Sequence, residues 1–203
     1  MQLFDRIEKA VEQFQKRKFI IVFSEKEGEG DLCLPAEAAT AATLIFMARV
    51  ASGILALALP RKRLEELEIE PLSSRYRHQD TPFFMPVDSL AVKTGSTAAD
   101  RAMTVRKIID PHTKPSDLAR PGHLPLLGAE PLGLLKRDGH TEAATEICQL
   151  AGLYPGALLC ELISDRGDAM NVKELRALAK KLRVPLITVG ALTKFARTLL
   201  KKT

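Results

Sequence analysis

The stretch Arg137-Asp138-Gly139-His140-Thr141-Glu142 joins a short apolar run to a segment of helical periodicity. The run before it, Leu132-Gly133-Leu134-Leu135, is typical of a buried strand. The segment after it, residues 141–150, places its apolar residues on one stripe, which predicts a helix with Thr141 as its N-cap. The stretch is therefore interpreted as a strand-to-helix turn, in which Gly139 allows a sharp bend or the close approach of a ligand.

This turn carries the groups of a phosphate site. A helix N-terminus presents free N–H groups and a partial positive charge, and Arg137 adds a guanidinium that can bind a phosphate through two parallel hydrogen bonds. His140 lies beside them and can ligate a metal ion or move a proton. A second interpretation stays open, in which the stretch is only a capped helix with a histidine and an arginine on its surface.

Apolar runs and periodic segments alternate irregularly along the rest of the 203 residues. Apolar runs predict further strands at residues 19–23, 54–59, 83–87, 158–163 and 186–189. Helical periodicity and capping residues predict helices at residues 3–14, 36–51, 61–70, 98–109, 171–182 and 195–200. Residues 71–81 read as an irregular loop. With no internal repeat and no long linker, we expect a single α+β domain over residues 1–203, with a mixed β-sheet covered by helices.

The composition is that of an ordinary soluble protein, with 46% apolar and 27% charged residues. Three cysteines without C-x-x-C spacing fit thiols in a reducing compartment, so we expect a cytoplasmic protein. The N-terminus lacks a basic segment followed by an apolar run, so we expect no signal peptide. The apolar segment 38–59 is interrupted by Arg49 and by Ser52-Gly53, and we expect no membrane span.

An acidic segment, Ser24-Glu25-Lys26-Glu27-Gly28-Glu29-Gly30-Asp31, follows the first predicted strand. If this loop is extended, the period of two places all four of its carboxylates on one side. A hard divalent cation such as Mg²⁺ prefers carboxylate oxygens, and the two glycines let the backbone bend around it. An acidic loop that contacts only solvent is the alternative.

Two more ionisable residues stand out. Glu161 lies inside an apolar run, where a carboxylate is unfavourable unless it is paired or functional. A glutamate at a strand end that reaches solvent is the other interpretation. His123 follows Pro121-Gly122 in an expected turn, which would fix the imidazole in space.

Several rare combinations occur together in this chain, namely Glu29-Gly30-Asp31-Leu32, Thr94-Gly95 with Ala98-x-Asp100-Arg101-Ala102, Pro121-Gly122-His123, Arg137-x-Gly139-His140-Thr141-Glu142 and Cys160-Glu161. In these motifs and their order the chain resembles the 3,4-dihydroxy-2-butanone 4-phosphate synthases of riboflavin biosynthesis over nearly its whole length. That family converts D-ribulose 5-phosphate to L-3,4-dihydroxy-2-butanone 4-phosphate and formate. The resemblance implies this lyase activity, Mg²⁺ or Mn²⁺ as cofactor, a homodimer with shared active sites, and a stand-alone form without a cyclohydrolase-like domain.

The resemblance also implies residue roles. Glu27 and His140 become metal ligands, and whether Glu29 binds a second metal ion stays open. His123, Glu161 and Asp31 become the catalytic residues, with Thr94 and His123 reaching in from the neighbouring subunit. The implied substrate contacts are Lys26, Glu27, Asp31, Thr94, Arg137, Asp138, Gly139, His140, Thr141 and Glu161. Lys26 stands where the family usually has an arginine, and a lysine cannot form the bidentate fork.

Two other functions are kept as alternatives. One is a relative that binds a metal ion and a sugar phosphate without turnover, as a sensor or partner subunit. The other is a nucleic-acid module, suggested only by the net charge of +5 and the basic C-terminal segment of Lys194, Arg197, Lys201 and Lys202. With no Trp and two Tyr the chain offers no stacking platform for bases. We therefore expect D-ribulose 5-phosphate and a second copy of the chain as partners, and neither nucleic acid nor membrane.

Overall fold

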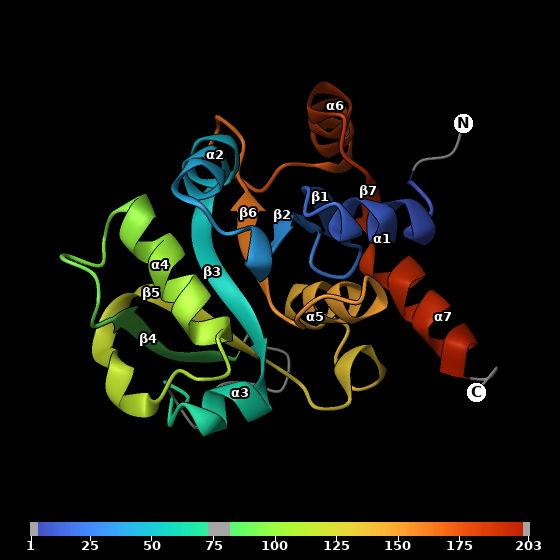
Figure 1. Cartoon of the computed structure of the whole chain (residues 1–203). Helices are drawn as coiled ribbons and strands as arrows, with labels where there is room; N and C mark the ends of the chain where they lie inside the picture. Colours follow the sequence, from blue (N-terminus) through green and yellow to red (C-terminus); the bar gives the residue numbers. More distant parts are fainter. Residues whose placement is uncertain (1–3, 73–81, 201–203) are drawn as a thin grey trace.

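A seven-stranded sheet forms the centre of the protein in the computed structural model, which describes residues 4–72 and 82–200. Its strand order is β4-β5-β3-β6-β2-β1-β7 (Figure 1). The β1–β7 and β3–β5 pairs are parallel and the other neighbours are antiparallel, so the predicted mixed sheet is confirmed. The strands are β1 (Ile20–Ser24), β2 (Glu29–Pro35), β3 (Ser52–Pro60), β4 (Phe83–Ser89), β5 (Leu118–Ala129), β6 (Ala157–Leu162) and β7 (Leu186–Thr188).

Helices cover both faces of this sheet, and the predicted α+β class is also confirmed. The α-helices are α1 (Ile7–Gln15), α2 (Ala41–Ala51), α3 (Arg61–Glu66), α4 (Ala98–Ile109), α5 (His140–Leu150), α6 (Val172–Leu182) and α7 (Val189–Leu200). The described residues also contain three short 3-10 helices, η1 (Ala36–Ala38), η2 (Pro115–Asp117) and η3 (Gly133–Leu135). No helix in the described ranges is long and apolar enough to cross a membrane.

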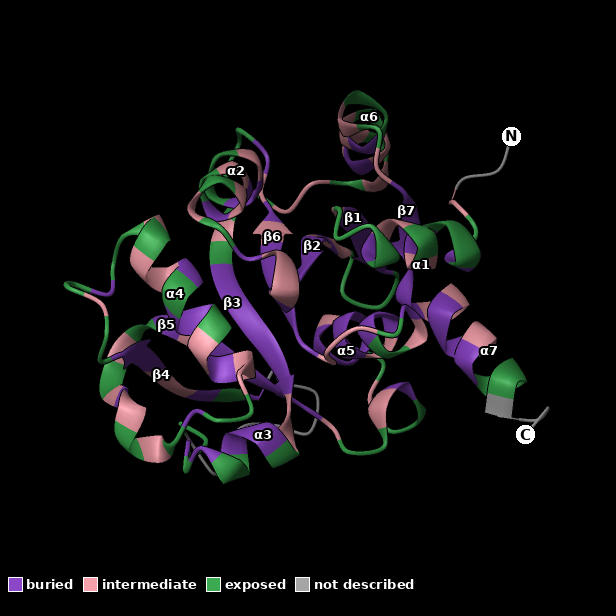
Figure 2. Ribbon diagram, in the orientation of Figure 1, coloured by how far each residue is buried: buried purple, intermediate pink, exposed green. Residues whose placement is uncertain are grey.

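The sheet separates two apolar cores, and the central strands consist mostly of buried residues (Figure 2). One core lies between the sheet and α2, α3, α4 and α6, and the other between the sheet and α1, α5 and α7. Strand β1 shows the division, because Ile21 and Phe23 belong to the first core while Ile20 and Val22 belong to the second. The predicted strand that is buried on both faces is thus confirmed.

Capping residues predicted the helix boundaries well. Helix α4 has the predicted bounds, and the Thr97 side chain accepts the Asp100 N–H at its start. Asn171 and Glu174 form a reciprocal capping box before α6. The predicted helix 36–51 is instead two pieces, η1 and α2, because Thr40 caps a new helix start. The last helix begins at Val189, six residues before the predicted start.

The run before the quoted stretch was predicted wrongly. Residues 132–135 are not a strand, because Leu132 is the N-cap of the 3-10 helix η3, and Leu132 is 67% and Leu135 49% exposed. Gly133 has a φ of +54°, a conformation that favours glycine and ends an extended run. Helix α5 begins at His140 with Gly139 at the N-cap, so Thr141 is not the cap. The stretch is therefore a turn-to-helix junction.

The acidic segment is a tight hairpin turn instead of a long loop. Residues 25–28 form the turn, and Glu29 already begins β2, a strand that the sequence analysis did not predict. Because the turn is tight, Glu25 leaves the side that Glu29 and Asp31 share, and its carboxylate accepts the Gly190 N–H at the start of α7. The single-sided arrangement of all four carboxylates was therefore wrong for Glu25.

Two other loop predictions differ from the structure or lie outside it. Pro121-Gly122-His123 belongs to strand β5 and is not a turn. The predicted loop 71–81 falls mostly on residues 73–81, which are outside the described residues, as are Lys201 and Lys202.

Candidate active site

A cavity of about 230 Å³ lies on the α5 face of the sheet. Its polar lining comes from the hairpin turn, β2, β6 and the first turn of α5, and consists of Glu27, Glu29, Asp31, His140, Thr141 and Glu161. Its apolar lining consists of Ile54, Ala56, Phe83, Leu127 and Leu159. Five predicted site residues from three separate parts of the sequence, together with Glu29, therefore meet around one space.

The sheet register sets the positions of the carboxylates in this cavity. Asp31 of β2 lies opposite Glu161 of β6 in the antiparallel ladder, so both side chains project from the same face. Glu29 is two residues before Asp31 and shares that face. Burial raises the pKa of each of these three carboxyl groups, and neighbouring carboxylates raise them further. Carboxyl groups with raised pKa values are suited to exchange protons with a substrate.

His140 is the cationic partner of these acids. Its Nδ1 lies 3.1 Å from Oε2 of Glu27, and only 10% of its side chain is exposed. Burial alone would lower the pKa of His140, but the carboxylates of Asp31, Glu27 and Glu29 outweigh burial and raise it to about 9. The hydrogen bond from His140 in turn lowers the pKa of Glu27. At neutral pH an imidazolium therefore sits among carboxylates.

Arg137 forms an internal ion pair. Its Nη1 lies 2.5 Å from Oε2 of Glu142, a side chain that is fully buried, and the other Glu142 oxygen accepts the Glu130 N–H. Gly139 makes room for this pair, since a Cβ there would lie 2.5 Å from Arg137 Nη1. Its φ of −109° is ordinary, so close approach and not a sharp bend is what requires a glycine.

Arg137, Gly139 and Asp138 do not line the 230 Å³ cavity. Asp138 forms an exposed ion pair with Lys26, with Nζ and Oδ1 3.2 Å apart. Both residues line a neighbouring cavity of about 530 Å³ between the hairpin turn, η3 and α7. Of the predicted substrate contacts, Lys26 and Asp138 thus line the second cavity, whereas Arg137 and Gly139 line neither.

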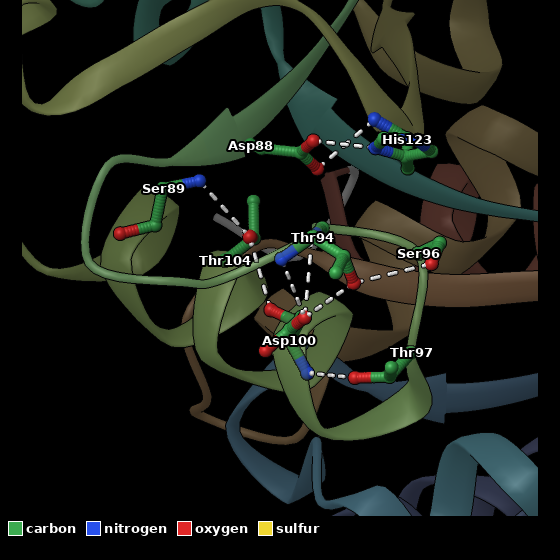
Figure 3. A network of polar contacts seen from close by, with 9 residues as sticks. Asp88, Ser89, Thr94, Ser96, Thr97, Asp100, Thr104 and His123 are labelled. Atoms are coloured by element: carbon green, nitrogen blue, oxygen red, sulfur yellow. Dashed lines mark hydrogen bonds and ion pairs between the residues drawn. The ribbon is translucent and has the colours of Figure 1, made fainter.

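Thr94 and His123 lie together at a third place, near the end of β4 (Figure 3). The His123 ring is bound by Asp88, and Thr94 is bound by Asp100 at the start of α4. Neither Thr94 nor His123 lines the 230 Å³ cavity of its own chain. The structure therefore does not bring them to the acidic cavity within one subunit.

Sequence reasoning left out two acids that the structure places at these sites. Asp88 follows the predicted strand 83–87 and was given no role. A carboxylate directly after a strand is a signal of a functional site at the end of that strand. Glu142 belonged to the quoted motif, but no role was given to it. Glu142 is buried because it lies in the first turn of α5 and faces the sheet. The sequence analysis placed the helix start at the wrong residue and therefore did not predict this burial.

The donor set fits a hydrated Mg²⁺ ion. Glu27 Oε2 and His140 Nδ1 lie 3.1 Å apart, so a carboxylate oxygen and an imidazole nitrogen are adjacent and could bind one ion once the nitrogen has lost its proton. His140 Nε2 is buried without a hydrogen-bond partner among the described residues. No group of three or more His, Cys, Asp or Glu in the described ranges is already placed to hold a metal. An ion that keeps several waters, as Mg²⁺ does, fits this arrangement better than one that needs a complete protein cage.

Comparison with known proteins adds an independent finding. Residues 8–195 match the family model described as 3,4-dihydroxy-2-butanone 4-phosphate synthase. The riboflavin biosynthesis protein RibBA of Aquifex aeolicus (strain VF5) is 38% identical over 198 residues, covering 95% of this chain and 49% of the relative. RibBA of Parabacteroides distasonis is 40% identical over 188 residues, covering 90% of this chain and 46% of the relative. The chain thus spans about half the length of these curated relatives.

Solved structures give the same result. The 3,4-dihydroxy-2-butanone 4-phosphate synthase of Candida albicans is 34% identical with a TM-score of 0.88, covering 96% of this chain and 99% of that one. A synthase of the same name in complex with two magnesium ions is 28% identical with a TM-score of 0.89, covering 96% of this chain and 98% of that one.

Proposed function

Because the chain belongs to the 3,4-dihydroxy-2-butanone 4-phosphate synthase family, we propose that it converts D-ribulose 5-phosphate to L-3,4-dihydroxy-2-butanone 4-phosphate and formate. The observation that carries the proposal is the Glu27–His140 pair inside a cavity lined by three more carboxylates. Enolisation, loss of a hydroxyl, rearrangement of the skeleton and loss of one carbon need acids and bases at several substrate atoms. The cavity supplies them within one small space.

Glu27 and His140 would hold the metal ion, Mg²⁺ or Mn²⁺. When bound, such an ion supplies positive charge that polarises a substrate carbonyl and stabilises an enediolate. The Ser24 hydroxyl accepts the Glu27 N–H at 3.2 Å and fixes the backbone at that ligand. The donor chemistry alone does not discriminate between the two ions, because carboxylate oxygens suit both.

Proton transfer is assigned to Asp31, Glu161 and His123. Asp31 and Glu161 face each other, so one can hold a proton while the other is ionised. Thr141 lies at the same cavity and can orient a substrate hydroxyl. The neighbouring 530 Å³ cavity offers a place for the phosphate end, because four basic residues, Lys26, Lys136, Lys194 and Arg197, line it against two acids, Glu25 and Asp138.

We further propose that the active site is completed across a homodimer, with Thr94 and His123 supplied by the partner subunit. The support is their position, since both lie outside the acidic cavity of their own chain. A two-fold dimer would place each subunit's β4–β5 end over the other's cavity. We also propose that residues 1–203 act as one domain and that the enzyme is cytoplasmic, as its three buried free cysteines favour.

The direct test is formate release from uniformly ¹³C-labelled D-ribulose 5-phosphate, followed by NMR with Mg²⁺, with Mn²⁺ and with EDTA. We expect formate with either metal and none with EDTA. Glu12→Gln, an exposed residue of α1, serves as a control that should behave as wild type. Binding of the sugar phosphate without any formate would overturn the synthase proposal in favour of a non-catalytic relative.

A further inference from the structure

Asp88 binds His123 through both carboxylate oxygens. The His123 ring Nδ1 lies 2.6 Å from Asp88 Oδ2, and the His123 backbone N–H donates to Oδ1 at 2.9 Å (Figure 3). The Asp88 side chain is only 11% exposed, while 52% of the His123 side chain is exposed. Nδ1 of the half-exposed His123 ring is therefore bound to the nearly buried carboxylate of Asp88.

The local backbone is built around this carboxylate. The β4–β5 register shifts between Val87, which pairs with Leu124, and Asp88, which pairs with Ala119, so the β5 segment between them bulges. Gly95 has a φ of +76°, and a Cβ there would lie 2.0 Å from Asp88 Oδ2. A Cβ at Gly122 would lie 2.1 Å from the Val87 carbonyl carbon. Two glycines thus leave the space in which Asp88 meets His123.

Asp88 also lies against the loop that contains Thr94 and Gly95, and Asp100 binds that loop. Asp100 Oδ2 accepts the Thr94 N–H, the Thr94 hydroxyl and the Gly95 N–H at 3.2, 3.0 and 3.1 Å. Since Gly95 packs on Asp88, and Asp88 binds the His123 ring, the loop with Thr94 and the ring of His123 hold fixed positions relative to each other. A rigid support of this kind is what a proton-transfer group requires to keep its geometry.

A carboxylate at Nδ1 determines which ring nitrogen carries the proton. When a neutral imidazole donates Nδ1–H to a carboxylate, Nε2 keeps its lone pair and can accept a proton. We propose that Asp88 is the positioning residue of His123, fixing the Nδ1–H tautomer and the ring orientation so that Nε2 acts on the substrate. The inference rests on the proposed function, in which His123 transfers protons.

Asp88→Asn tests this role with little change in shape. The amide oxygen can still accept the His123 backbone N–H, but the amide NH₂ group donates and cannot accept Nδ1–H. The His123 tautomer is then expected to change, with Nδ1 accepting a hydrogen bond from the amide and the proton on Nε2. The matched control is Asp110→Asn, because Asp110 Oδ1 accepts the backbone N–H of another histidine, His112, at 2.9 Å.

The readouts are formate turnover, the Kd for Mg²⁺, and the ¹⁵N NMR spectrum of the histidine rings recorded at alkaline pH. His123→Asn assigns the signals. In Asp88→Asn we expect kcat to fall by about 10²–10⁴-fold, the range that acid–base catalysis contributes. KM and the Mg²⁺ Kd should change less than about threefold, because Asp88 does not line the acidic cavity. The ring should switch from the Nδ1–H to the Nε2–H form, and Asp110→Asn should leave every readout unchanged.

Two results would overturn the inference. One is wild-type kcat in Asp88→Asn. The other is loss of activity with the tautomer of His123 unchanged, which would mean a purely structural role. If Asp88→Asn does not fold, the wild-type spectrum decides, because an Nε2–H tautomer there contradicts the inference. If the wild-type protein releases no formate, the synthase proposal fails, and the tautomer comparison still tests whether Asp88 positions the ring.

Discussion

Asp31 and Glu161 are direct partners across the β2–β6 ladder, on the sheet face that forms the floor of the acidic cavity. Opposed side chains in an antiparallel pair have Cβ atoms about 4.5–5.5 Å apart, and like charges there destabilise the fold. Burial raises the pKa of both groups, and the Asp31 carboxylate raises that of Glu161 further. Asp31 and Glu161 therefore do not increase the stability of the folded protein when they are ionised.

Glu161→Gln should therefore stabilise the metal-free protein at pH 7. A carboxyl group whose pKa is raised on folding lowers stability as the pH rises above its unfolded value, which is about 4.3 for glutamate. The gain in Tm should be present at pH 7, shrink as the pH falls through about 4.3, and disappear about one pH unit below that value, where the group is protonated in both states. Thermal unfolding with EDTA measures it, with Glu12→Gln as the exposed control. A lower Tm for Glu161→Gln at pH 7 would contradict this account.

Glu27→Gln should remove most of the metal-dependent activity. The amide keeps the size of the side chain but loses the anionic oxygen that a hard cation prefers, so kcat/KM should fall by roughly 10²-fold or more. Raising the Mg²⁺ concentration should recover little of it, while sugar-phosphate binding without metal should change little. Formate assays over a Mg²⁺ titration provide the measurement. Wild-type rates in this variant would exclude Glu27 from the site.

Mg²⁺ binding should release a proton from His140. Its pKa of about 9 means that the imidazolium form dominates at pH 7, and a metal ligand must be deprotonated. The apparent Mg²⁺ affinity should rise up to about tenfold per pH unit from pH 7 and level off near pH 9. Calorimetry in buffers of different ionisation enthalpy measures the released protons. His140→Gln should abolish the dependence and His112→Gln should keep it, and an affinity that is independent of pH in the wild type would refute this metal site.

Gly139→Ala should disrupt the Arg137–Glu142 pair. The added Cβ would lie 2.5 Å from Arg137 Nη1 and 3.0 Å from Glu142 Oε2, and overpacking of this kind lowers the free energy of unfolding by about 1–3 kcal/mol. Gly190→Ala is the control, since its Cβ would meet only the end of the exposed Glu25 side chain and alanine favours the helix. Chemical denaturation compares the two. Equal stabilities would show that Gly139 is not needed for close packing.

A subunit-exchange experiment tests the shared site. His123→Asn and Glu161→Gln should each be inactive alone, but a mixed dimer of the two has one site with both lesions and one with neither. Equal mixing makes about half of all dimers mixed, so roughly a quarter of the sites should be intact. Recovery of formate release near that level is expected after verified exchange. Activity that stays at zero would place His123 and Glu161 in the same site from the same chain.

Local signals in the sequence predicted much of the fold. Thr97 and Asn171 marked helix starts because a capping side chain acts within three residues, and the apolar run at residues 19–23 predicted a strand because both of its faces are buried. Strand β2 was missed because its first residues are charged or glycine, and their burial depends on the neighbouring strand β6. The pairing of Asp88 with His123 depends on a register shift between β4 and β5, which no local pattern encodes.

The site residues divide in the same way. Motif resemblance pointed to Glu27, Asp31, His140 and Glu161, and these four line one cavity. Arg137 was predicted as a phosphate ligand from its guanidinium beside a helix N-terminus and from the resemblance, and its pairing with Glu142 could not be foreseen while the run before it was taken as a strand. Whether each residue has its predicted role is what the experiments above decide.

Ile54 and Phe83 line the acidic cavity, and they are 65% and 37% exposed although both are large and apolar. In the single chain, water therefore reaches the mouth of the cavity, where 33% of the Glu27 side chain is exposed. Any surface that covers these two side chains would expel that water, and the interaction between charges about 4 Å apart would rise from about 1 to about 4 kcal/mol as the effective dielectric falls from about 80 to 20. Covering Ile54 and Phe83 would thus strengthen the interactions between the charged groups in the cavity.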